Sequence, residues 1–131
     1  MRKYKKYITK GIHEPLSEVQ FHKKAPIKRI SMLSKKTIPE SKIHVAVHFV
    51  DAIDKKISKY SILHMHDVDE VNILLSQNDK LVYEIQLDDE IYKVSSPVTI
   101  FIPKGVNHRA DVISGSGFFV CLIMSNKYKT S

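Results

Sequence analysis

Two short stretches of the sequence contain side chains that commonly bind metal ions. The first, HMHDVDE, runs from His64 to Glu70, and the second, PKGVNH, runs from Pro103 to His108. Imidazole nitrogens and carboxylate oxygens together suit divalent transition metals. Side chains on an extended strand alternate between its two faces, so His64 and His66 point the same way and lie about 6–7 Å apart. Two imidazoles at this spacing can approach one ion.

Turn-forming residues lie within both stretches. Asp67 to Asp69 form a brief polar turn, which lets Glu70 return to the centre that the two histidines face. In the second stretch, proline ends a strand because it has no N–H to donate to a β-ladder, and Gly105 permits a sharp turn. We expect His108 to begin the returning strand.

The elements that must position these residues are short β-strands. From residue 43 onward, runs rich in Val, Ile, Phe and Tyr alternate with polar or turn residues, which is typical of antiparallel β-structure. The runs are Ile43–Ile53, Lys59–His66, Glu70–Ser76, Leu81–Leu87, Glu90–Val94, Val98–Ile102, Asn107–Ser114 and Phe118–Ser125. Asp88-Asp89 is expected to form a tight hairpin turn, and Gly115-Ser116-Gly117 a flexible one. This all-β pattern predicts a single-domain antiparallel jelly-roll β-barrel over residues 43–131.

Basic residues are concentrated before this barrel. Residues 1–42 hold 12 Lys and Arg against 3 Asp and Glu, whereas residues 43–131 hold 9 against 11, within a net charge of +7. We interpret residues 1–42 as an irregular, solvated N-terminal arm that lies on the barrel or on a partner, with a short strand around Ile27–Leu33. This distribution disfavours nucleic-acid binding.

The single cysteine and the hydropathy pattern bear on location. Cys121 has no partner for an intramolecular disulfide, which favours a reducing, cytoplasmic compartment, and we expect it to be a small core residue. No apolar run of signal-peptide or membrane-span length follows the basic start of the chain, so we predict neither secretion nor membrane binding.

The two metal-binding stretches together resemble the motifs of the cupin superfamily. Its first motif is His-x-His, three or four residues and then Glu, and its second contains Pro-x-Gly-x-x-His; both stand here in the family's order. The resemblance spans roughly residues 58 to 125. The family's usual glycines are replaced by Ser58, Gln77 and Pro97, and its usual asparagine by Val112, at positions that shape turns and the surroundings of the ligands.

The resemblance implies one divalent metal ion inside the barrel. Its ligands would be the motif histidines and the motif glutamate, namely His64, His66, Glu70 and His108. Asp67 and Asp69 are rival carboxylates, which we expect in solvent at the turn because Glu70 has the family spacing. Nitrogen and oxygen ligands leave the metal open among Fe(II), Mn(II), Ni(II), Co(II), Cu(II) and Zn(II).

This ligand set leaves one or two coordination positions open for a substrate. The ion can then polarise a carbonyl or enolate oxygen, or activate dioxygen if it is redox-active. By resemblance, we first expect a dioxygenase, an oxidoreductase that acts on a small oxygenated organic molecule. The same ligands also serve a metal-dependent isomerase, epimerase or lyase of a sugar-like or keto substrate, or a non-catalytic small-molecule-binding cupin.

Strand alternation selects further residues beside the expected ligands. We expect Tyr60 and Ile62 to face the cavity beside His64. Asn72 and Leu74 share a face with Glu70, and Ala110 shares one with His108. Tyr60 and Asn72 are candidate contacts of a substrate or of the ligands themselves. The catalytic residues stay unassigned, because the expected chemistry is centred on the metal.

Two more histidines lie on the first long strand. His44 and His48 share one face, while the other face carries Ile43, Val45, Val47 and Phe49. The more apolar face is the better core face, so we expect both histidines to be exposed or at an interface. Whether they line the cavity is left open.

The strand Val71–Leu75 is apolar on both faces. This pattern indicates that both of its faces are covered. We therefore predict a homodimer that is built partly from residues 1–42 lying across the partner.

Overall fold

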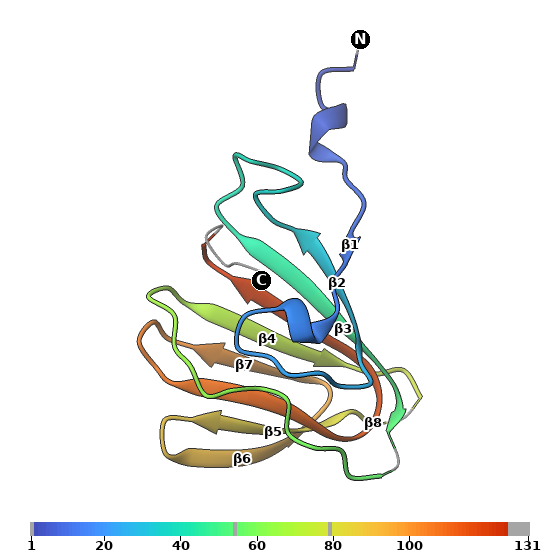
Figure 1. Ribbon diagram of the computed structural model, residues 1–131, viewed down its shortest axis with the longest axis vertical. Coiled ribbons are helices and arrows are strands. Elements are labelled where there is room, and N and C mark those ends of the chain that lie inside the picture. Colours follow the sequence, from blue (N-terminus) through green and yellow to red (C-terminus); the bar gives the residue numbers. More distant parts are fainter. Residues whose placement is uncertain (1, 54, 79, 126–131) are drawn as a thin grey trace.

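The computed structural model describes residues 2–53, 55–78 and 80–125. These residues contain eight strands and two short 3-10 helices (Figure 1). In chain order they are η1 (Lys5–Tyr7), β1 (Ile12–His13), η2 (Leu16–Glu18), β2 (Lys28–Leu33), β3 (His44–Ile53), β4 (Glu70–Leu75), β5 (Val82–Leu87), β6 (Glu90–Ser95), β7 (Val98–Ile102) and β8 (His108–Ile123). No helix among them is long and apolar enough to cross a membrane.

The strands form an antiparallel sheet that folds over itself. One part has the order β1-β2-β3-β8-β4-β7, and β5 and β6 continue from the first half of β8 (Figure 1). The buried side chains lie between the two parts. This arrangement is an open jelly roll, and it confirms the predicted fold class.

β8 replaces the two separate strands that we expected at 107–114 and 118–125. Its first half pairs with β5, and its second half pairs with β3 and β4. One strand therefore belongs to both parts of the sheet. The prediction of two strands was wrong because the glycine-rich stretch between them bends the chain without ending the pairing.

Gly115 and Gly117 produce this bend, with φ angles of +91° and +149°. A Cβ atom at Gly115 would collide with the backbone oxygen of Lys80, and one at Gly117 with that of Leu75. Glycine is required here because another backbone approaches closely, not because the strand turns back. The other expected turn is confirmed: Asp88-Asp89 joins β5 to β6, and Asp88 adopts φ +53°.

The inward face of β3 is the polar one. His44 and His48 are each 2% exposed, whereas Phe49 on the opposite face is 37% exposed. The expectation that these histidines are exposed was therefore wrong. Apolarity did not identify the core face, because the outer face of this strand is also apolar and the interior contains a buried polar group that bonds to both imidazoles.

Apolar side chains fill the remainder of the interior. The most deeply buried include Leu74, Leu81, Tyr83, Ile85, Ile102, Phe119 and Ile123. The rings of Tyr83 and Phe119 stack at a centroid distance of 4.8 Å and join the two parts of the sheet. Cys121 is buried in the same core, as predicted.

Part of the N-terminal arm belongs to the sheet. β2 pairs with β3, which confirms the short strand expected around 27–33, and β1 pairs with β2. Residues 2–11, which include η1, extend away from the barrel (Figure 1). Tyr4 and Ile8 in this extension are 65% and 82% exposed.

Candidate metal centre

Three histidines from two places in the chain converge at one end of the interior. His64 and His66 lie in the extended segment before β4, and His108 begins β8. One ring nitrogen of each lies within 4.8 Å of the other two, so the group could hold a metal ion. The ring centroids of His64 and His108 are 4.4 Å apart.

Glu70, the first residue of β4, reaches into this group. Its Oε1 lies 3.3 Å from Nε2 of His66 and 3.2 Å from Nε2 of His108. Burial opposes ionisation of Glu70, but hydrogen bonds with His108 and His66 outweigh burial and hold its pKa well below the usual value. The carboxylate is therefore charged at neutral pH. We call these four residues, His64, His66, Glu70 and His108, the carboxylate cluster.

Backbone carbonyls orient two of the rings. Nδ1 of His64 lies 2.5 Å from the oxygen of Ile62, and Nδ1 of His108 lies 3.0 Å from that of Val106. Because a carbonyl can only accept, each Nδ1 carries a proton, which leaves Nε2 as the nitrogen that would bind a metal ion. In His108 this Nε2 donates to Glu70 while the site holds no metal, and it would release that proton on metal binding. Burial also lowers the pKa of His64 to about 4, which keeps its imidazole neutral at pH 7. Neutral imidazoles beside a carboxylate fit a divalent metal ion.

Asn72 and Cys121 support the carboxylate from β4 and β8. Nδ2 of Asn72 donates to Oε2 of Glu70 at 2.8 Å, and Sγ of Cys121 lies 3.5 Å from the same oxygen. Both side chains are buried. Asn72 thus faces the interior, where its contact is with an expected ligand.

The segment that carries His64 and His66 is not the strand expected at 59–66. Within these residues only isolated bridges occur, Ser61 with His22 and His64 with His108. The prediction was wrong because this backbone bonds to scattered groups rather than to one neighbouring strand: backbone groups of residues 21–23, 105 and 108, and the side chain of Asp111.

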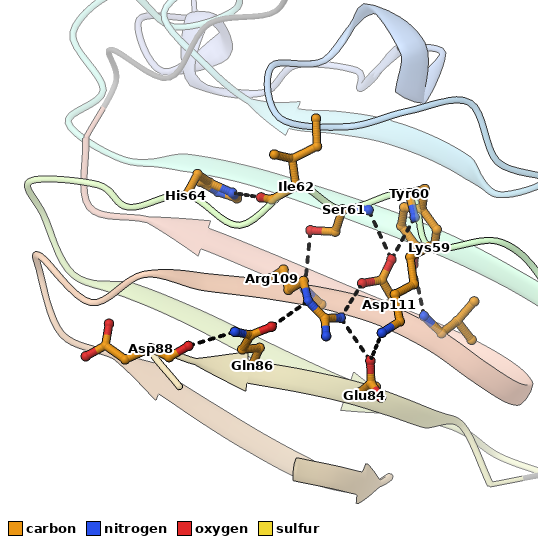
Figure 2. A network of polar contacts seen from close by, with 12 residues as sticks. Lys59, Tyr60, Ser61, Ile62, His64, Glu84, Gln86, Asp88, Arg109 and Asp111 are labelled. Carbon is orange, nitrogen blue, oxygen red and sulfur yellow. Dashed lines mark hydrogen bonds and ion pairs between the residues drawn. The ribbon is translucent and has the colours of Figure 1, made fainter. Parts of the chain in front are cut away.

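Asp111 provides most of this side-chain anchoring (Figure 2). Its Oδ1 accepts hydrogen bonds from the backbone N–H groups of Tyr60 at 2.8 Å and Ser61 at 3.0 Å. Its Oδ2 pairs with Nη1 of Arg109 at 2.9 Å, and the same nitrogen lies 2.9 Å from Oε2 of Glu84. The network therefore fixes the backbone a few residues before His64 to the strand that begins with His108.

Three other residues near the motifs lie elsewhere than in the metal centre. Tyr60 is 1% exposed, and its hydroxyl accepts from the N–H of Val112 in the core. Ile62 is 44% exposed, so the expectation that it faces the interior was wrong; strand alternation fails because this segment is irregular. Asp69 lies at the exposed turn, where it accepts from the backbone N–H of Lys104 at 3.0 Å.

The sequence patterns missed the contribution of the arm. The ring of Phe21 stacks on that of His64, with centroids 4.3 Å apart and an interplanar angle of 7°. Phe21 adopts a φ of +65°, which is uncommon for a non-glycine residue. It lies in a segment without motif or periodicity, so no sequence signal identified it.

A second polar group, Arg29, His44 and His48, was also missed; we call it the arginine cluster. Arg29 on β2 is 3% exposed, its Nη1 lies 3.0 Å from Nε2 of His48, and its Nη2 lies 3.4 Å from Nε2 of His44. The alternation of β3 did place the two histidines on one face, but it did not show that this face points inward.

Comparisons with known proteins show similarity at the level of structure. No family model and no curated protein matches the sequence. An RmlC-like cupin from Shewanella frigidimarina matches with a TM-score of 0.56 and 16% identity, covering 86% of this chain and 82% of that one. A cupin 2 conserved barrel domain protein from Rhodopseudomonas palustris matches with a TM-score of 0.59 and 14% identity, covering 91% and 74%.

An oxalate decarboxylase from Bacillus subtilis also matches, with a TM-score of 0.58 and 12% identity. That match covers 93% of this chain but 31% of the longer enzyme. These identities are too low to transfer an activity, but the barrel shared along most of the chain agrees with the order of the two motifs. The protein therefore has the cupin fold.

Proposed function

We propose that the carboxylate cluster binds one divalent transition metal ion through three imidazole nitrogens and the carboxylate of Glu70. The observation that carries the proposal is the convergence of the three ring nitrogens within 4.8 Å around a buried, ionised carboxylate. When bound, such a metal polarises an oxygen of a substrate or activates dioxygen. The metal is a member of the Fe, Mn, Ni, Co, Cu and Zn group.

Contacts within the chain orient the ligand side chains before a metal ion binds. The carbonyls of Ile62 and Val106 fix the tautomers of two histidines, and Asn72 holds one oxygen of Glu70. Phe21 covers one face of the His64 ring. These contacts leave little freedom for the ligands to reorganise, which favours tight binding.

We further propose that the protein is an enzyme that acts on a small oxygenated organic molecule, and that a dioxygenase is the first activity to test. An isomerase or epimerase needs a general base with a pKa near neutrality. Burial lowers the pKa of both His22 and His44 to about 4, so neither is a strong base. These two histidines therefore give no support to the base-driven alternative.

Oxygen uptake separates these activities. The protein is loaded separately with Fe(II), Mn(II), Ni(II) and Zn(II), and oxygen consumption is followed with a panel of diols, hydroxy acids and diketones. Substrate-dependent uptake with Fe(II), lost in Glu70→Gln, supports the dioxygenase. Metal-dependent turnover without oxygen uptake would instead establish the isomerase or lyase, and binding without turnover a non-catalytic cupin.

We also propose that a second copy of the chain covers the outer face of the sheet. Apolar side chains lie in register there across β3, β8 and β4. They are Val45, Val47, Phe49, Phe118, Val120, Leu122, Val71, Ile73 and Leu75. Phe118 and Leu75 are 41% and 47% exposed, so this face resembles one half of a β-sandwich interface.

In this homodimer the exposed extension before β1 lies across the partner. Light scattering at micromolar concentration should give twice the mass of the chain, and Phe118→Glu should give a monomer. Tyr92→Glu, on the edge strand β6, is the control and should stay dimeric. A monomeric wild-type protein would overturn this proposal without affecting the metal centre.

A further inference from the structure

The arginine cluster is a buried cation that contacts two neutral imidazoles and one carboxylate. Besides its contacts to the two imidazoles, Nε of Arg29 donates to Oε1 of Glu14 at 3.4 Å. Burial lowers the pKa of His44 to about 4 and that of His48 well below the usual value, and the charge of Arg29 adds to both effects. Both imidazoles therefore accept from the guanidinium as neutral groups.

The arginine cluster and the carboxylate cluster share one interior. His44 on β3 and Glu70 on β4 both pair with Ile123 of β8, from opposite sides. Neighbouring strands lie about 4.8 Å apart, which places the Cα atoms of His44 and Glu70 about 10 Å apart. The two charges also act on one thiol: burial and Glu70 raise the pKa of Cys121, and Arg29 opposes them. A small molecule can span this distance.

His48 provides an independent indication of a ligand. Its Nε2 accepts from Arg29, so its Nδ1 carries the ring proton. This Nδ1 is buried and has no hydrogen-bond partner among the described residues. A buried N–H without an acceptor is unfavourable, so an acceptor atom of a bound molecule would stabilise the site.

We propose that Arg29 and His48 bind a carboxylate group, and that the substrate of the proposed metal centre is accordingly a small carboxylic acid. A carboxylate accepts charge-assisted bonds from a guanidinium, which are stronger than bonds to a neutral imidazole. It also accepts from Nδ1 of His48. Another oxygen of the same molecule then lies toward the carboxylate cluster. The inference rests on the proposed function, since it names the substrate class of that site.

The net positive charge of the interior also favours an anionic substrate. A divalent ion with three neutral imidazoles and the Glu70 carboxylate would carry a net charge of +1, and the Glu14 carboxylate at 3.4 Å compensates only part of the charge of Arg29. An anionic substrate reduces this excess, whereas a neutral sugar or diketone does not. Anion binding is therefore favoured by both ends of the site.

The test compares acids with their neutral amides. Metal content of the wild-type protein is measured first, and calorimetry then gives the affinities for malonate against malonamide and for lactate against lactamide. We expect the acid to bind at least about tenfold more tightly than its amide in one or both pairs. Arg29→Lys and Arg29→Gln should remove most of this preference at unchanged metal content. Lys28→Gln, which removes an exposed positive charge from the same strand, should keep it.

Equal affinities for acid and amide in both pairs in the wild type would overturn the proposal. So would an Arg29 variant that keeps its metal and keeps the preference. Should neither Arg29 variant fold, the comparison on metal-free protein decides, because no metal contributes to the preference there. The measurement is repeated on metal-free His108→Ala, where some preference for the acid should persist because Arg29 supplies it. A failed metal centre would appear separately, as wild-type protein without metal.

Discussion

The two histidine clusters of this barrel use the same side chain for opposite purposes. In the carboxylate cluster, Glu70 lies against two imidazoles and makes the group attractive to a cation. In the arginine cluster, Arg29 donates to two imidazoles and makes the group attractive to an anion. The charged neighbour, not the histidine, determines which kind of ligand each cluster fits.

The clusters also differ in how the backbone holds them. His44 and His48 lie on a regular strand, where the ladder to β2 and β8 fixes them. His64 and His66 lie in an irregular segment whose backbone is held by Asp111 and by the bridge to His108. Perturbation of single side chains should therefore loosen the carboxylate cluster more than the arginine cluster.

Metal removal should produce the largest effect and act on the carboxylate cluster alone. A ligand that binds only the folded state at 1,000 times its Kd stabilises that state by about 4 kcal/mol. A chelator should therefore lower the Tm by several degrees, and added metal should restore it. Calorimetry on Glu70→Gln provides the control, because its Tm should no longer respond to metal. An unchanged Tm after verified metal removal from the wild type would contradict the account.

The second-largest effect should be a loss of folding stability at acid pH, to which the arginine cluster contributes. His44 has a folded-state pKa of about 4, below the unfolded value near 6.5, so the unfolded chain takes up protons first as the pH falls. Stability present above pH 6.5 is therefore lost between pH 6.5 and 4, by at most about 1.4 kcal/mol per pH unit for each such histidine.

The variant His44→Gln should flatten this dependence in metal-free protein, as denaturant unfolding at several pH values would show. Glutamine can still accept from Arg29 but does not titrate. An equally steep loss of stability in His44→Gln would exclude this histidine as its source. In the carboxylate cluster, His64 acts in the same direction because burial lowers its pKa to about 4, and His108 acts in the opposite direction because its hydrogen bond with Glu70 outweighs burial and raises its pKa.

Asp111→Ala should weaken the backbone support of the carboxylate cluster. It leaves two backbone N–H groups without their acceptor, which should cost about 2–3 kcal/mol of unfolding free energy and weaken metal binding. Lys59→Ala removes an exposed ion pair with Glu84 in the same network and should cost at most about 1 kcal/mol. Equal effects of the two variants in urea unfolding would argue against the anchoring role of Asp111.

Phe21→Ala should have the smallest effect. It removes a stacked ring from His64, a contact that contributes about 1 kcal/mol. We expect faster metal release in a chelator-competition experiment, with little change in the stability of the metal-free protein. Tyr92→Ala, which removes an exposed ring, should release metal at the wild-type rate.

The carboxylate cluster could be anticipated from the sequence because its residues stand in two compact stretches with turn signals beside them. The strand pattern likewise predicted the jelly roll, and only the division of β8 was wrong. The arginine cluster could not be anticipated: Arg29 and His44 are far apart in sequence, and their contact depends on β2 pairing with β3. Apolar residues on both faces of β3 also concealed its inward face.

The network around Asp111 could not be predicted from the sequence for a related reason. Its bonds to Tyr60 and Ser61 connect residues about fifty positions apart and replace a ladder that the strand pattern had predicted. Local periodicity cannot report such long-range side-chain bonds to backbone. The same limitation applies to Phe21, whose place over His64 depends on the path of the arm.

The most direct test of the account is the metal content and affinity of three matched variants beside the wild type. His108→Ala removes a histidine from the carboxylate cluster, His48→Gln changes one in the arginine cluster, and Asp69→Ala removes the rival carboxylate. After saturation and dialysis, we predict one ion per chain in the wild type, His48→Gln and Asp69→Ala, and loss of most affinity in His108→Ala with the fold retained. Wild-type stoichiometry and affinity in His108→Ala would contradict the proposed metal centre.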